Sequence, residues 1–96
     1  MNTIEETNEQ VNALRIDFLL ADSQTAIAFL NLAEDELATE EDRERRFRAA
    51  INAYNTIVKL LPRTNFPPEQ YEALMKNLTA LRGRLDRHLA MYPEVA

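Results

Sequence analysis

The sequence predicts an all-α fold, an antiparallel three-helix bundle, and two observations lead to this class. The helix formers Ala, Leu, Glu and Arg dominate the chain, whereas one Gly and four Pro are too few for the tight turns of a β-rich fold. Three segments also carry apolar residues at the 3.6-residue period of a helix. We therefore predict helices near residues 11–36, 40–61 and 68–92.

One domain accounts for this pattern. A chain of 96 residues can bury a core without covalent or metal cross-links. It contains no cysteine, which excludes disulfides, thiolate metal sites and thiol nucleophiles. We expect residues 1–10 to form a flexible or weakly helical N-terminal segment and residues 11–96 to form a single helical-bundle domain.

The first predicted helix carries a regular apolar stripe at alternating spacings of three and four residues. This spacing places the stripe on one face of a helix. We predict that it faces the core, and its members are Val11, Leu14, Phe18, Ala21, Thr25, Ala28 and Leu32.

The second predicted helix has clear signals at both ends. Thr39 suits the N-cap, with Asp42 at the third helical position as in a capping box. Pro62 ends the helix, because the residue before a proline avoids the helical conformation. The predicted core face comprises Phe47, Ala50, Tyr54, Ile57 and Leu61.

The third predicted helix starts at Pro68, because a proline is tolerated in the first turn of a helix. The short loop before it makes the second and third helices antiparallel neighbours. Phe66 is expected to pack against Tyr71 at this start. The predicted core face comprises Tyr71, Leu74, Leu78, Leu81, Leu85 and Tyr92.

The first helix also has a second apolar face, nearly opposite the stripe. A surface helix of a three-helix bundle needs one apolar arc, so two other helices cannot easily cover both faces. We predict that the second face binds a partner through Ile16, Leu20, Ile27 and Leu30. A homodimer is the favoured explanation; docking of another protein and coverage within the chain are the alternatives.

No set of residues suggests catalysis, a cofactor or a bound metal. His88 is the single histidine and Ser23 the single serine, and no spacing joins them into a nucleophile and base. A di-iron motif would need a glutamate three residues before the histidine, where the chain has Leu85. We therefore predict a protein that is not an enzyme and a histidine with a structural role.

Basic residues gather at one end of the predicted bundle. Residues 1–42 hold eleven carboxylates and one cation, whereas residues 43–96 hold five carboxylates and ten cations. Antiparallel packing would bring four arginines together as a possible anion-binding site: Arg43, Arg46, Arg84 and Arg87. We favour the alternative, in which neighbouring acids such as Glu34 neutralise these arginines.

Charge and hydropathy narrow the predicted partners. The net charge of −5 argues against nucleic acid and anionic lipid. No apolar run approaches the roughly 20 residues that span a bilayer, and the acidic start is unlike a signal peptide. We expect a cytoplasmic protein whose partner is a protein and not a membrane, with a homo-oligomer favoured.

Four residues carry a resemblance to a known family. Ala50, Tyr54, Ile57 and Pro62 stand at offsets of zero, four, seven and twelve. This resembles the second helix of a tetratricopeptide-type helical hairpin, although that family prefers alanine at the position of Ile57. The resemblance implies binding of a peptide or helix in a groove between helices.

The sequence thus predicts a non-enzymatic protein–protein interaction module that self-associates through its first helix. The alternative is a small-ligand or anion-binding helical domain that uses the arginine-rich end.

Overall fold

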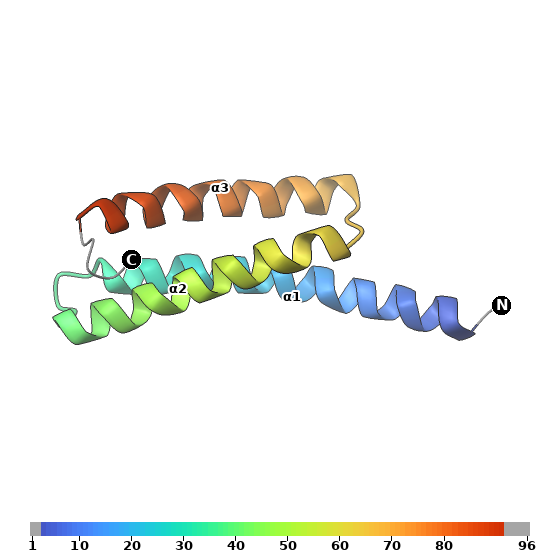
Figure 1. The fold of residues 1–96 in the computed structure, drawn as a ribbon, viewed down its shortest axis with the longest axis horizontal. Helices are drawn as coiled ribbons and strands as arrows, with labels where there is room; N and C mark the ends of the chain where they lie inside the picture. Colours follow the sequence, from blue (N-terminus) through green and yellow to red (C-terminus); the bar gives the residue numbers. More distant parts are fainter. Residues whose placement is uncertain (1–2, 92–96) are drawn as a thin grey trace.

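The structure is a computed structural model that describes the backbone of residues 3–91 and the side chains of residues 8–91. The described range contains three long helices and no strand: α1 (Thr3–Ala33), α2 (Glu40–Leu60) and α3 (Pro68–Met91). A single 3₁₀ turn, η1 (Leu61–Arg63), follows α2. Successive helices run in opposite directions, which confirms the predicted antiparallel three-helix bundle (Figure 1).

The helix α1 is the central element of the bundle. It packs closely against both other helices, whereas α2 and α3 approach each other at few points. Its N-terminal turns extend beyond the connection between α2 and α3, and this makes the molecule elongated, with extents of 55 × 21 × 21 Å (Figure 1).

The two ends of α1 differ from the sequence prediction. The helix begins at Thr3, so the segment before residue 11 continues α1 as far as it is described. The helix ends at Ala33 and not near residue 36. The Oδ1 atom of Asp35 accepts a hydrogen bond from the backbone N–H of Leu37 at 2.8 Å, and this Asx turn competes with further helix.

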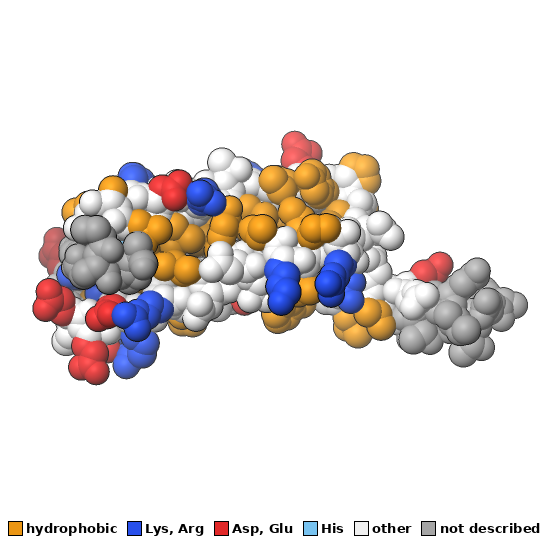
Figure 2. Space-filling view, viewed as in Figure 1, with side chains coloured by type: hydrophobic (Ala, Val, Ile, Leu, Met, Phe, Trp, Pro, Cys, Tyr) orange, Lys and Arg blue, Asp and Glu red, His pale blue; other side chains and the backbone are white. Residues whose placement is uncertain are grey.

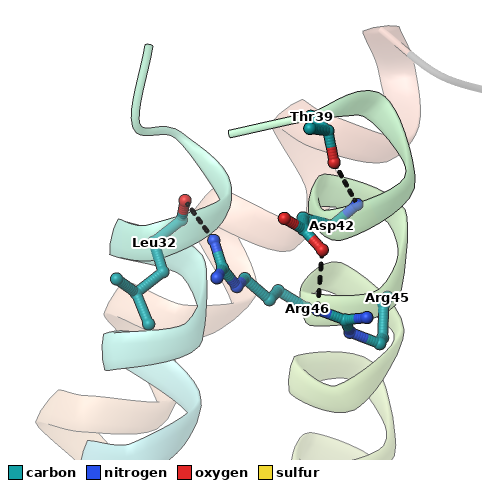
Figure 3. Close-up of polar contacts among 5 residues, drawn as sticks. All are labelled: Leu32, Thr39, Asp42, Arg45 and Arg46. Atoms are coloured by element: carbon teal, nitrogen blue, oxygen red, sulfur yellow. Dashed lines mark hydrogen bonds and ion pairs between the residues drawn. The ribbon is translucent and has the colours of Figure 1, made fainter. Parts of the chain in front are cut away.

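The ends of α2 and α3 agree with the prediction within one residue. The Oγ1 atom of Thr39 accepts a hydrogen bond from the backbone N–H of Asp42 at 3.1 Å, which confirms the N-cap (Figure 3). The carboxylate of Asp42 pairs with Arg45 at 2.7 Å. At the start of α3, the rings of Phe66 and Tyr71 meet edge to face at 6.1 Å.

Most predicted core residues of α2 and α3 are buried. They belong to two adjoining clusters along the bundle. Tyr54 and Leu61 are half-buried, Tyr71 is exposed, and Tyr92 lies outside the described residues. The confirmed core positions are Phe47, Ala50, Ile57, Leu74, Leu78, Leu81 and Leu85.

The prediction for the core face of α1 was wrong. All seven residues of the predicted core stripe are exposed. The opposite face is buried, and it shows the same alternation of three and four residues: Ile16, Leu19, Ser23, Ala26, Leu30 and Ala33. Both faces therefore fit a helical period, and periodicity alone could not choose between them.

A polar contact with α3 favours the buried face. Ser23 is completely buried, and its Oγ donates a hydrogen bond to the carbonyl oxygen of Leu20 at 2.7 Å. The same Oγ accepts a hydrogen bond from Nδ2 of Asn77 at 3.0 Å. Buried polar groups need hydrogen-bond partners, and Asn77 gives this hydroxyl a second one that joins α1 to α3.

Candidate functional site

The four residues predicted to bind a partner are part of the core. Ile16 and Leu30 are 6% and 1% exposed, and Leu20 and Ile27 pack half-buried against the two clusters. The two other helices cover this face of α1, so it offers no docking surface. The face predicted to bind a partner is thus buried within the chain, and the face predicted to form the core is exposed.

The exposed apolar face of α1, here called the α1 stripe, consists of Val11, Leu14, Phe18, Ala21, Thr25, Ala28 and Leu32. Leu14 is 70% exposed and Phe18 is 51% exposed. The stripe follows a strict seven-residue repeat over three heptads. Its a positions are Val11, Phe18, Thr25 and Leu32, and its d positions are Leu14, Ala21 and Ala28. This pattern is typical of a helix that packs against one other helix along a coiled-coil seam.

A second apolar surface lies between α2 and α3. Orange side chains gather along this groove in Figure 2, and its walls include Tyr54, Val58 and Met75. Arg82 crosses the groove: its guanidinium carbon lies 5.7 Å from the centre of the Tyr54 ring, and a second contact pairs it with Asp86 at 3.0 Å. The hydrogen bonds to Tyr54 and Asp86 raise the pKa of Arg82.

Two of the predicted anion-binding arginines bind the end of α1. The Nε atom of Arg43 donates to the carbonyl oxygen of Ala33 at 2.9 Å. Arg46 donates to the carbonyl oxygen of Leu32 at 3.3 Å (Figure 3). The last carbonyls of a helix lack partners within the helix and carry its negative dipole end, so positively charged donors stabilise them. Arg43 supplies one for Ala33, and Arg46 shares the carbonyl of Leu32 with the backbone N–H of Asp35.

The other two predicted arginines lie on α3 beside this helix end. Arg84 forms an ion pair with Glu34 at 2.8 Å, and its side chain is only 18% exposed. Arg84, Arg87 and Arg43 line one shallow depression, together with His88, whereas Arg46 lies outside it. The structure therefore brings three of the four arginines together and uses two of those three for contacts within the chain.

His88 is a packing residue in this depression. Its ring stacks on Phe47 with 3.7 Å between the ring centres. Burial lowers the pKa of His88; the positive charge of Arg43 lowers it further, and the negative charge of Glu34 raises it. Ser23 lies in the core between α1 and α3, bound to Asn77, so the histidine and the serine do not form a catalytic pair.

Two further findings concern the described residues. Among them, no group of three or more His, Cys, Asp or Glu side chains is placed to hold a metal ion. None of the helices in this range has both the length and the apolarity needed to cross a membrane.

Comparison with known proteins found no match to this chain among protein-family models, curated proteins or solved structures. Of the four residues that resemble a tetratricopeptide-type helix, Ala50 and Ile57 are buried, Tyr54 is half-buried and Pro62 lies in η1. The resemblance itself stays a prediction.

Proposed function

We propose that this chain is a non-enzymatic protein–protein interaction module of the cytoplasm that self-associates through the α1 stripe. The exposure of this stripe is the observation that carries the proposal. Four large apolar side chains, those of Val11, Leu14, Phe18 and Leu32, are each at least 44% exposed on one face of one helix.

The arrangement of these side chains favours an interaction surface over scattered surface hydrophobes. Single exposed apolar residues are common on proteins, whereas a contiguous apolar patch is typical of a contact site. The α1 stripe is continuous over three heptads, and it lies on the helix that both other helices already hold in place. A rigid, straight seam of this kind matches the surface of another helix.

The groove between α2 and α3 is less suited to a long helical partner. Arg82 covers part of the groove through its contacts with Tyr54 and Asp86, which a docking helix would have to displace. No comparable polar contact crosses the α1 stripe among the described residues.

A matched pair of variants tests the proposal. Leu14 belongs to the stripe, and Val58, 44% exposed, lines the groove between α2 and α3 instead. We expect light scattering after gel filtration to give wild-type protein and Val58→Glu twice the 11.1 kDa mass of the chain. Leu14→Glu should give a single chain with unchanged helicity. Equal masses for both variants would refute the proposal.

The second candidate function is anion binding at the arginine-rich end, because Arg43, Arg84 and Arg87 surround one depression. The ion pair between Arg84 and Glu34 opposes it, since a bound anion would compete with that carboxylate. If the depression binds phosphate, adding phosphate should raise the melting temperature of wild-type protein more than that of Arg87→Gln. Equal shifts would reject this candidate.

A further inference from the structure

We infer that the partner of the α1 stripe is a second copy of α1 in the antiparallel direction, with Phe18 of one chain opposite Ala21 of the other. This inference rests on the proposed function and adds the orientation and the register of the two helices. Two independent features of the stripe lead to it: the order of large and small side chains, and the charges on its flanks.

Side-chain size changes along the stripe. The N-terminal half carries the large residues Val11, Leu14 and Phe18, and the following three positions carry small ones. In a parallel pair each residue would meet its own copy, so the helices would have to be far apart at Phe18 and close together at the next layer. Two helices pack at a nearly constant distance of about 8–10 Å, which disfavours this alternation.

An antiparallel pair removes this conflict, because the large half of one helix lies against the small half of the other. With a positions opposite d positions, one register pairs every large residue of the N-terminal half with a small one. The facing pairs are Val11 with Ala28, Leu14 with Thr25, and Phe18 with Ala21. The two-fold axis then passes between the levels of residues 19 and 20.

The charged flanks of the stripe favour the same orientation. Asp17 and Asp22 occupy the g and e positions beside it. A parallel pair brings g of one helix next to e of the following heptad of the other, which would place Asp17 beside Asp22 twice. In the antiparallel register Asp17 lies beside Gln24 and Asp22 lies beside Arg15, so repulsion is replaced by two ion pairs.

Arg15 can serve both its own chain and a partner. One of its terminal nitrogens donates to the carbonyl oxygen of Arg63 at 2.8 Å, which anchors the guanidinium to the end of η1. A guanidinium has five N–H donors, so others stay available for the carboxylate of a partner's Asp22.

The length of α1 also fits this arrangement. Asn12 exchanges hydrogen bonds with Asn65 in the loop before α3, at 2.8 and 2.9 Å. Beyond Asn12 the helix continues for about two and a half turns. Asn8 and Glu9 still line a depression with Asn65 and Gln70, and the turns before them extend past the other two helices (Figure 1). In the proposed register residues 6–11 lie along residues 28–33 of α1 in the second copy.

Disulfide trapping distinguishes the orientations, because the native chain has no cysteine. A tagged chain with Leu14→Cys is mixed with an untagged chain that carries either Thr25→Cys or Leu32→Cys, and the mixture is oxidised. The tag changes the mass of the chain, so gel electrophoresis separates 14–14 disulfides from 14–25 and 14–32 disulfides. We expect the 14–25 disulfide to dominate, since facing residues bring their Cα atoms within the roughly 7 Å that a disulfide needs.

The other outcomes separate the two proposals. Dominant 14–14 disulfides would show a parallel pair, and dominant 14–32 disulfides would show a different antiparallel register; either result overturns this inference and leaves self-association intact. A dimeric mass without any disulfide also overturns it. A monomeric mass for the unmodified chain overturns this inference and the proposed function together.

A charge exchange provides an independent test. Arg15→Asp and Asp22→Arg should each weaken self-association by about three- to tenfold, because each places like charges at both ion-pair positions. An equimolar mixture of the two variants should regain wild-type affinity, because the mixed dimer restores both pairs. Mixed dimers as weak as the separate variants would contradict the register.

Discussion

Leu14 and Leu19 lie five residues apart on α1, yet Leu14 is 70% exposed and Leu19 is completely buried. The two leucines belong to two different heptad stripes of the same helix. One stripe faces α2 and α3 and forms the core, and the other faces away from the bundle. Among the described residues, α1 thus carries apolar side chains on two faces, and the other two helices cover one of them.

The two stripes should respond differently to the same truncation. Leu30→Ala removes a fully buried side chain and should lower the free energy of unfolding by about 2–5 kcal/mol. Leu32→Ala should change it by less than about 0.5 kcal/mol. Urea denaturation in a Leu14→Glu background, where self-association is removed, measures both. If Leu32→Ala lost more stability than Leu30→Ala, the core of the protein would lie on the opposite face of α1.

The buried hydrogen bond between Ser23 and Asn77 should be measurable as a coupling energy. Ser23→Ala and Asn77→Ala should each lower the free energy of unfolding by about 1 kcal/mol. The double variant should lose about 0.5–1.5 kcal/mol less than the sum of the two, because the shared bond can be lost only once. Strictly additive losses would show that the bond contributes nothing.

The arginines at the end of α1 should differ in importance. Arg43→Ala removes a hydrogen bond to the carbonyl oxygen of Ala33 and should cost about 1.5–3 kcal/mol of stability. Arg45→Ala removes an exposed ion pair with Asp42 and should cost at most about 0.5 kcal/mol. Thermal or urea unfolding distinguishes the two, and similar losses would mean that the contact with Ala33 does not stabilise the helix end.

His88 should make the free energy of unfolding fall as the pH decreases. Burial lowers its pKa in the folded state, so the unfolded chain binds the proton more readily. The stability is therefore complete above the ordinary pKa of about 6.5 and falls as the pH drops below it. Wild-type protein should lose more stability than His88→Gln between pH 7.5 and pH 5.5.

Proton NMR checks the cause of this effect directly, because the chain has a single histidine. The ring protons of His88 should titrate below pH 6.5. A midpoint above 6.5 would show that Glu34 outweighs burial and the charge of Arg43 at this site.

The sequence was sufficient to predict α2 and α3 because each helix has one apolar stripe and clear end signals. Thr39 caps α2 and Pro68 starts α3 as predicted, and the leucines of α3 from Leu74 to Leu85 are buried. In α1 the two stripes share the same period. One contact of the buried stripe joins Ser23 to Asn77, 54 residues away. The periodicity of α1 does not reveal such a contact, so it could not distinguish the two stripes.

The arginine-rich end shows a similar limit of sequence reasoning. Charge and antiparallel packing predicted that the arginines gather at one end, and three of them line one depression there. Two of the predicted arginines, Arg43 and Arg46, bind backbone carbonyls of α1. These carbonyls belong to the last turn of a helix that ends at Ala33, next to the Asx turn of Asp35, and the sequence prediction placed the helix end three residues later.

The most direct test of self-association through the α1 stripe is sedimentation equilibrium of the wild-type chain over a wide concentration range, beside Phe18→Asp. We expect the wild-type mass to rise from 11.1 kDa to twice that value as the concentration increases. Phe18→Asp should remain at 11.1 kDa throughout. A wild-type chain that stays at 11.1 kDa up to millimolar concentration would contradict self-association, and a dimer that Phe18→Asp leaves intact would contradict the role of the stripe.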